Sequence, residues 1–433
     1  MKADAAAITD EVRRGWLDAM EDPVREGLLA SGPPDLDAVL GLFPRLEGAP
    51  AFDPQLIQGN IERLRTTPDV NTGHPFLDLA VKTGLAHIDA TFQGDHPKYG
   101  VEGYGQSRHD GFPPTIVAAV DALTAWGVHD RAAQLFRYWL LHFVQPDGTI
   151  RYYGPALSEY GQLLHTAALL HERAGAGAWL DDGGAALARM ADHLLALCRQ
   201  AEAAGDLIPG VPEADISPGD PHGGGDPTHN ESNRFFHNNA WVGRGLLRWA
   251  ALSEAAGLLP ARSVAEIRAT AERLIDRVLA AIDAAWPKDP ADWWLPPQVE
   301  AAPRPACLTA STLGSYTNYR YWPELLASGI LPEALAHRLV DARLTGGGQF
   351  CGMTRFAGHL DDWPLADYLC ALWQLGRRDD FLLSLYGHVA YHQADGHLTA
   401  YEQVSLPPAG QMRAPYCLPC QLVAARAARL LVQ

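Results

Sequence analysis

The fold is clearest in residues 113–136, which read PPTIVAAVDALTAWGVHDRAAQLF. Residues 113–127 are apolar or small on nearly every face, which is typical of a helix that is buried on both sides. Gly127 then matches a helix-terminating glycine, and a second helix with a polar face begins within a few residues. The stretch therefore predicts an antiparallel pair of helices, of which the first is fully buried.

The same unit of helix, glycine and helix recurs along the chain. It is found at Gly127, Gly175, Gly257, Gly329 and Gly376. The units lie about 45 to 80 residues apart, which is too irregular for a short-repeat solenoid. First helices such as 363–376 and 415–432 are apolar or small on nearly every face, whereas second helices such as 178–200 carry a single apolar stripe. The first helices are therefore expected to form an inner ring and the second helices an outer ring.

We therefore expect an all-α fold, an (α/α)6 toroid of six helical hairpins over residues 75–433 that begins with an outer helix at 76–90. Residues 1–74 are expected to form an N-terminal helical extension that packs on the barrel or makes a contact in a homo-oligomer. No strand-like alternation recurs, so TIRYY at 149–153 and HLTAYEQV at 397–404 are expected to be loop ribbons.

The composition favours a small neutral or cationic ligand. The 433 residues carry a formal net charge of −17 without a basic cluster, which argues against nucleic acid or an anionic membrane as the partner. No apolar run approaches the roughly 20 residues that span a bilayer. The N-terminus lacks the apolar segment of a secretory signal, so a cytoplasmic protein is expected. Cys417 and Cys420 form a lone CxxC and are expected to be small core residues at a helix start.

Charged and aromatic residues concentrate in the long loops that precede inner helices. These loops all lie on one side of the hairpins, whereas the glycine-terminated connections on the other side are short. A carbohydrate pocket needs aromatic rings that stack on sugar faces and charged groups that bind hydroxyls. In these loops the candidate substrate-binding residues are Tyr153, Glu159, Tyr319, Trp322 and Trp363.

The order of the loops resembles that of glucoamylases and related six-hairpin glycosidases. These enzymes place a sugar-binding Arg-Asp element before the first inner helix, a general acid before the third, a sugar-binding Arg before the fifth and a general-base Glu before the sixth. The matching residues in this sequence are Arg108 with Asp110, Glu231, Arg355 and Glu402. The resemblance implies an inverting glycoside hydrolase that acts on a small or exo-presented glycoside, with Glu231 as acid and Glu402 as base.

Four alternatives stay open at this point. Asp226 and Glu159 compete with Glu231 for the role of the acid. A sugar epimerase or isomerase of the same shape would use a histidine pair such as His237 and His392. The stretch QPDGTI at 145–150 suggests a terpene-cyclase-like toroid, and a non-catalytic sugar-binding protein is also compatible with the fold. Neither a metal nor a cofactor is expected, because the histidines lack a metal-binding spacing such as HExxH.

Overall fold

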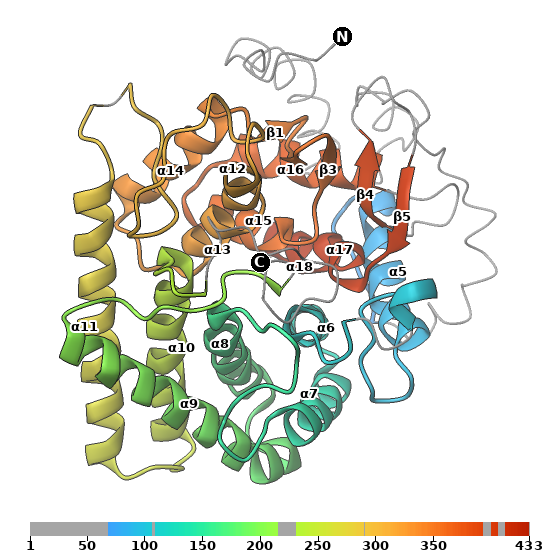
Figure 1. Cartoon of the computed structure of the whole chain (residues 1–433). Helices are drawn as coiled ribbons and strands as arrows, with labels where there is room; N and C mark the ends of the chain where they lie inside the picture. The colour runs from blue at the N-terminus through green and yellow to red at the C-terminus, as the bar shows by residue number, and fades with distance from the viewer. Residues whose placement is uncertain are drawn as a thin grey trace.

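The computed structural model describes residues 68–105, 109–214, 231–289, 291–392, 400–405 and 412–432. In this part of the chain, outer and inner helices alternate and form a ring (Figure 1). The outer helices are α5 (Pro75–Thr91), α7 (His129–Phe143), α9 (Ala178–Ala204), α11 (Ala261–Ala285), α14 (Glu333–Thr345) and α16 (Arg378–Tyr391). The inner helices are α6 (Pro113–Ala125), α8 (Leu157–Ala174), α10 (Phe236–Ala255), α12 (Thr312–Tyr316) with η4 (Thr317–Tyr321) and α13 (Trp322–Ala327), α15 (Leu365–Gln374), and α17 (Leu418–Gln421) with α18 (Val423–Ala428).

The inner helices close the ring by packing in chain order. Helix α6 contacts α8, α8 contacts α10, α10 contacts α13, α13 contacts α15, and α15 contacts α18. The last inner helix, α18, then packs against α6, so both ends of the barrel sequence meet. The expected all-α toroid of six hairpins is therefore confirmed.

Burial separates the two rings as their residue patterns predict. In α6 nearly every side chain is buried, from Ile116 to Leu123. Helix α7 buries Phe136 and Trp139 on one stripe, while Arg137 on another face stays about half exposed. A helix with one apolar stripe can cover a core from one side only, which places it in the outer ring.

The five glycines of the predicted hairpins all have positive φ, between 65° and 79°. Each follows the end of an inner helix and precedes an outer helix after a short connection. In this region of φ a Cβ atom is strained, so glycine both ends the helix and reverses the chain direction. All short connections therefore lie at one end of the toroid, and the long loops lie at the other.

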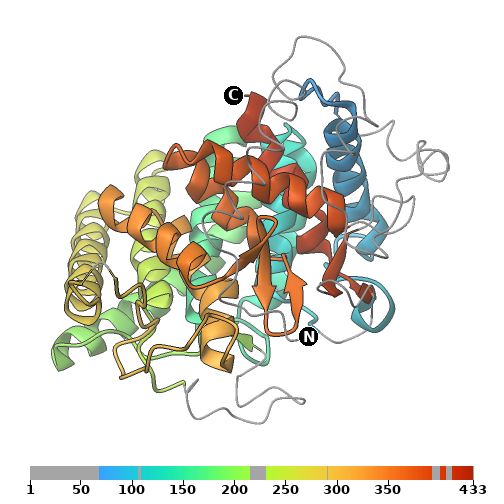
Figure 2. The same ribbon diagram turned by 90° about the horizontal axis from the view of Figure 1, so that it is seen from above.

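A small antiparallel sheet covers part of the end that carries the long loops (Figure 2). Its strands pair in chain order, as β1 (Gln349–Phe350), β2 (Met353–Phe356), β3 (His359–Asp361), β4 (Tyr401–Ser405) and β5 (Met412–Tyr416). Figure 2 shows the C-terminus at the opposite end of the toroid.

The sequence predicts a loop ribbon at residues 397–404, of which 400–404 are described. This prediction is wrong for the described part, because β4 begins at Tyr401. Leu360 of β3 pairs with Val404 of β4, and this partner lies too far away in the sequence for a local pattern to reveal the strand. The helix predicted at 415–432 begins later than expected. Strand β5 extends to Tyr416, and the chain becomes helical only at Leu418.

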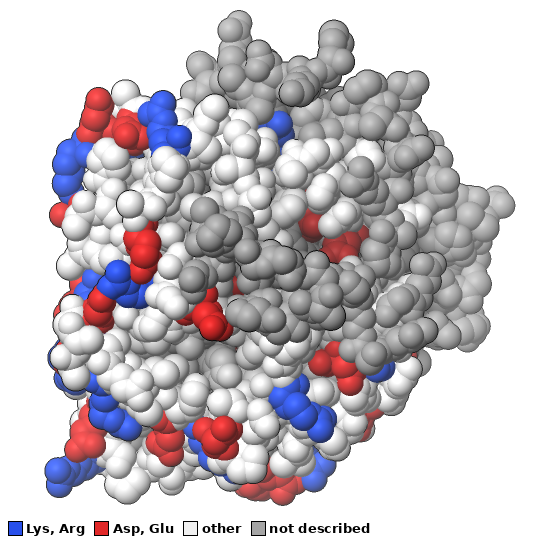
Figure 3. Space-filling view, in the orientation of Figure 1, with Lys and Arg blue, Asp and Glu red and all other residues white. Residues whose placement is uncertain are grey.

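Residues 1–67 of the expected N-terminal extension lie outside the described residues, so a division of the chain at residue 74 stays a prediction. No described helix is both long enough and apolar enough to cross a bilayer. On the face of Figure 1, acidic and basic side chains of the described surface are interspersed (Figure 3).

Candidate active site

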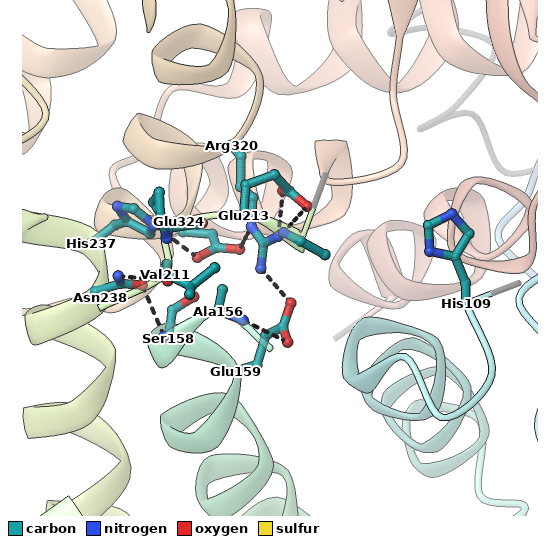
Figure 4. A network of polar contacts seen from close by, with 12 residues as sticks. His109, Ala156, Ser158, Glu159, Val211, Glu213, His237, Asn238, Arg320 and Glu324 are labelled. Atoms are coloured by element: carbon teal, nitrogen blue, oxygen red, sulfur yellow. Dashed lines mark hydrogen bonds and ion pairs between the residues drawn. The ribbon is translucent and has the colours of Figure 1, made fainter. Parts of the chain in front are cut away.

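Four charged side chains form a buried network at the end of the toroid where the long loops enter the inner helices. Arg320 lies in η4, a π-helical turn, and π-turns are frequent at functional sites. Its guanidinium donates to Oε1 of Glu159 at 2.7 Å, to Oε1 of Glu324 at 2.6 Å and to Oε2 of Glu213. All four side chains are at most 4% exposed. Figure 4 shows the three carboxyl groups around Arg320, and we call these four residues the Arg320 network.

The Arg320 network holds more carboxyl groups than its single guanidinium can neutralise. If all three glutamates were ionised, two buried negative charges would lack a counter-charge. Burial raises the pKa of Glu159 against the attraction of Arg320, and repulsion by Glu213 and Glu324 adds to the rise. The pKa of Glu159 reaches about 8, so this carboxyl keeps its proton at neutral pH.

The start of α10 holds the loop segment that carries Glu213. The side chain of Asn238 donates to the backbone carbonyl of Val211 at 3.0 Å. Nε2 of His237 lies 3.3 Å from the carbonyl oxygen of Pro212, to which it donates. Burial lowers the pKa of His237 well below its usual value, so the ring is a neutral donor. These contacts fix the loop before α10 from Val211 to Glu213.

Aromatic side chains from several loops pack beside the Arg320 network. We call this set the aromatic cluster, and it comprises Tyr99, Tyr104, Phe112, Tyr319 and Trp363, with Tyr152, Tyr153, Tyr316 and Phe356 packed against them. The Trp363 ring lies 5.3 Å from the Arg320 guanidinium, within the range of a cation–π contact. Ala214, the residue after Glu213, is also part of the cluster. The cluster therefore includes Tyr319 and Trp363 from the sequence prediction, with Tyr153 at its border.

Glu402 lies on the side of the aromatic cluster formed by the loop between α5 and α6. Tyr99 donates its hydroxyl to Oε1 of Glu402 at 2.6 Å, and Tyr104 donates to Oε2 at 2.9 Å. The pairing of β4 with β5 shifts register between Tyr401 and Gln403, and such bulges redirect side chains next to active sites. Glu402 is 8% exposed and is held by donors to both oxygens.

His109 connects the two loops that border the cluster. Its Nδ1 lies 2.8 Å from the Tyr152 hydroxyl and 3.1 Å from the Tyr153 hydroxyl. Its φ is +55°, a left-handed conformation that non-glycine residues rarely adopt and that often occurs at functional sites. The ring also contacts Tyr99 and Tyr104, so His109 packs against both tyrosines that hold Glu402.

The other predicted substrate-binding residues occupy different surroundings. Asp110 is one-third exposed and accepts hydrogen bonds from His96 at 2.7 Å and Lys98 at 2.9 Å. These bonds outweigh burial and lower the pKa of Asp110. Arg355, in β2, donates to the carbonyl of Gly347 at 2.8 Å. Asp110 and Arg355 thus both lie in loops at the elaborated end of the toroid.

Trp322 does not join the aromatic cluster. It is 1% exposed and packs in the main core, where its indole N–H donates to the carbonyl of Leu295 at 3.2 Å. The sequence places it in the correct loop, but it is the first residue of α13, which turns it toward the core.

The predicted acid, Glu231, is exposed at the end of the loop that precedes α10. Glu159, one of its competitors, lies in the Arg320 network, where Oε2 also accepts from the backbone N–H of Ala156 at 3.1 Å. Arg108 and Asp226 lie outside the described residues.

Sequence reasoning missed Arg320, Glu213, Glu324, Tyr99 and Tyr104. Arg320 stands in SYTNYRYWPE, the segment that also contains the predicted residues Tyr319 and Trp322. Glu213 stands in GVPEAD, in the same loop as Glu231, so its place before the third inner helix was an available signal. Tyr99 and Tyr104 precede the first inner helix, but only their contact with Glu402 reveals their role.

One group of side chains in the described part of the chain could hold a metal ion. Ligand atoms of His388, His392 and Cys420 lie within 4.8 Å of one another, and all three residues are buried. His388 contacts Oδ2 of Asp362 at 3.1 Å, and the Cys420 thiol donates to the carbonyl of Tyr401 at 3.0 Å. An ion could bind here only if these hydrogen bonds gave way. Both Cys417 and Cys420 are free, fully buried residues at the start of α17, as the sequence predicts.

The fold is shared with solved structures of glycosidases. A glycosidase variant in complex with glucose aligns with a TM-score of 0.57 and 14% identity, over 82% of this chain and 97% of the other. An unsaturated glucuronyl hydrolase specific for heparin aligns with a TM-score of 0.52 and 11% identity, over 83% and 96% of the two chains. A metal-independent α-mannosidase of Streptococcus pneumoniae, bound to α-1,6-mannobiose in a non-productive complex, aligns with a TM-score of 0.52 and 11% identity, over 88% and 98%.

This chain has the six-hairpin toroid fold of glycosidases. No protein-family model and no curated protein matches its sequence. At these identities the likeness concerns the fold, and the activity must be argued from the site.

Proposed function

We propose that this chain is a glycoside hydrolase whose sugar-binding site is the aromatic cluster between Glu402 and the Arg320 network. The observation that carries the proposal is Glu402, a nearly buried carboxyl that accepts from two tyrosine hydroxyls at the border of this cluster. Aromatic rings beside fixed carboxyl groups suit sugars, which present apolar C–H faces and hydroxyl edges. Glucose and mannobiose bound to glycosidases of the same fold support a carbohydrate substrate.

Glu402 acts as the general base in this proposal. An inverting glycosidase needs one carboxylate that activates water and one carboxylic acid that protonates the leaving oxygen from the opposite face. Hydrogen bonds from Tyr99 and Tyr104 to its two oxygens fix the orientation of the Glu402 carboxyl group. A carboxylate held in this way can take a proton from water without first changing its position.

The acid comes from the loop before the third inner helix, and two described glutamates of that loop compete for the role. Glu231 was the sequence prediction, but it is exposed and does not belong to the aromatic cluster or the Arg320 network. Glu213 is buried, directly precedes a residue of the aromatic cluster and shares the Arg320 network with a protonated Glu159. Glu159 lies in the first turn of α8, the second inner helix, and is therefore not part of this loop. We therefore assign the acid role to Glu213.

The test is a panel of glucosides, mannosides and unsaturated uronides, with the product anomer followed by NMR. On a disaccharide that the wild type cleaves, Glu402→Gln and Glu213→Gln should each lower kcat by about 10²- to 10⁴-fold. On an aryl glycoside whose leaving group needs no proton, only Glu402→Gln should keep its large effect. Glu231→Gln is the matched control from the same loop, and it should retain nearly full activity.

Two results would reject parts of this proposal. Full activity of Glu402→Gln on every cleaved glycoside would exclude it as the base. Loss of activity in Glu231→Gln with retention in Glu213→Gln would return the acid role to the residue that the sequence predicted.

Among the described residues, no contact favours the two other enzyme classes. His237 packs on Tyr321 and His392 packs on His388, so each of these histidines has its own partners. A terpene cyclase needs an apolar cavity, whereas the elaborated end of this toroid carries the charged Arg320 network.

A further inference from the structure

A cavity lies inside the toroid at the end opposite to the aromatic cluster. Its volume is about 400 Å³, within the range of small-molecule sites. It is lined by Ala125 at the end of α6, Arg173 near the end of α8 and Gln374 at the end of α15. The aromatic cluster and the Arg320 network stand at the opposite ends of the inner helices, so the two sites are separate.

The cavity has a surplus of positive charge, although the whole chain is acidic. Five arginines and three carboxyl residues line it, which leaves two positive charges in excess. Two of the arginines account for all three carboxylates. Arg426 binds Asp121 at 2.6 Å and Asp367 at 2.7 Å, and Arg248 binds Glu172 at 2.7 Å.

The remaining arginines, Arg173, Arg244 and Arg429, make no close ion pair with a carboxylate among the described residues, although Glu172 attracts Arg244 from a longer distance. Positive side chains near helix C-termini can serve to offset the helix dipole, which would explain Arg173 and Arg429. This effect fades beyond the last turn, and Arg244 lies well inside α10, which ends at Ala255. Arg244 therefore needs another explanation.

Buried nitrogen atoms around the cavity lack hydrogen-bond partners. They are Nδ1 of His165, Nε1 of Trp241 and Nε of Arg248 and Arg429, all from residues that line the cavity. The indole and guanidinium N–H groups can only donate. Unpaired buried donors are costly, and a ligand rich in acceptor oxygens would satisfy these four atoms once their side chains turned toward the cavity.

We propose that this cavity binds a small dianion, a phosphate or a phosphate monoester, with Arg244 as its main unpaired ligand. Two negative charges match the surplus of two positive charges. A phosphoryl group offers several acceptor oxygens to the fork of an arginine. The site shares no residue with the proposed glycoside site, so either proposal can fail without the other.

Isothermal titration calorimetry on the full chain tests the proposal, with inorganic phosphate, glucose 6-phosphate and succinate at matched ionic strength. The wild type should bind phosphate or glucose 6-phosphate saturably, and more tightly than succinate. Arg244→Gln should weaken binding by about tenfold or more, as expected for a lost charge-assisted hydrogen bond. Arg262→Gln is the matched control, because its exposed side chain on α11 lies outside the cavity.

Tighter binding of glucose 6-phosphate than of inorganic phosphate would identify a phosphate monoester as the ligand, and equal binding would identify the phosphoryl group alone. Arg429→Gln serves as a second cavity variant if Arg244→Gln does not fold, and it too should weaken binding. The proposal is overturned if neither phosphate compound binds with a Kd below about 10 mM, which corresponds to a standard free energy of binding of roughly −3 kcal/mol. Tighter binding of succinate, or wild-type affinity in the folded cavity variants, would overturn it equally.

Discussion

At the scale of single residues, the Arg320 network shows how burial sets protonation. A glutamate in water is ionised at neutral pH, but Glu159 shares one guanidinium with two other buried carboxyl groups. A proton on Glu159 removes one of the two negative charges that the guanidinium cannot neutralise. The protonated state is thus a property of the network, not of the residue type.

Glu159 makes the stability of the protein depend on pH. Its folded pKa of about 8 lies above the ordinary value of 4.5, so the folded state binds this proton more tightly than the unfolded state. The stabilisation is complete below about pH 4.5 and is lost as the pH rises through about 8. Thermal unfolding should therefore show that stability falls between pH 7 and 9, by roughly 1 to 1.5 kcal/mol from this group.

Replacement of Glu159 by Gln, which resembles the protonated form, should remove most of this dependence above pH 7. The exposed Glu231→Gln variant should keep the wild-type profile and serves as the control. Buried histidines with lowered pKa, such as His165, do not interfere in this range, because their contribution changes below about pH 6.5. A profile of Glu159→Gln identical to that of the wild type would contradict the assigned protonation.

At the scale of elements, the toroid depends on close approach of its inner helices. Helices α8 and α10 meet at Gly161 and Gly245. A Cβ atom on Gly161 would lie 2.0 Å from the carbonyl oxygen of Trp241, and one on Gly245 would lie 2.4 Å from the Cα of Gly161. These atoms belong to the backbone, so the helices would have to move apart.

Gly161→Ala should destabilise the protein by about 1 to 3 kcal/mol, because overpacking outweighs the gain in helix propensity. Gly184→Ala is the matched control within α9, where the nearest atom to a new Cβ is a side-chain carbon at 3.8 Å. That variant should be stabilised by about 0.5 to 1 kcal/mol. Chemical denaturation of both variants checks the opposite signs, and a stabilised Gly161→Ala would show that the helices are not in tight contact.

At the scale of the whole molecule, Arg426 contributes to closing the ring. It lies in α18, the last inner helix, and binds Asp121 of the first inner helix and Asp367 of the fifth. All three side chains are at most 30% exposed, so the pairs are screened less than surface ion pairs. A single side chain thus joins the last inner helix to the first and the fifth inner helices, where the ring closes.

Arg426→Met should lower the free energy of unfolding by about 2 to 3 kcal/mol, since it leaves two partly buried carboxylates without their partner. The comparison is Arg268→Met, which removes a pair with Glu254 whose side chains are 44% and 64% exposed. Its loss should cost under about 1 kcal/mol. Equal effects in urea denaturation would show that ring closure does not depend on Arg426.

The ring itself, and the end of it at which the charged and aromatic loops lie, could be predicted from the sequence. Helices that are apolar on every face, glycines at their ends and half-polar second helices are local features, and each follows from the burial of one short segment. Long loops on one side of every hairpin were visible for the same reason. Glu402, Tyr319 and Trp363 could therefore be named from their loops.

The tertiary structure alone decided which of these loop residues meet. Glu159 lies in α8, Arg320 in η4 and Glu213 in the loop before α10, and ring closure brings these three residues together. Trp322 entered the core instead, because its position in α13 directs its side chain there. Contacts between residues a hundred or more positions apart leave no periodic pattern in the sequence. Each of these side chains could pair with many others, and the packing of the helices decides which one it meets.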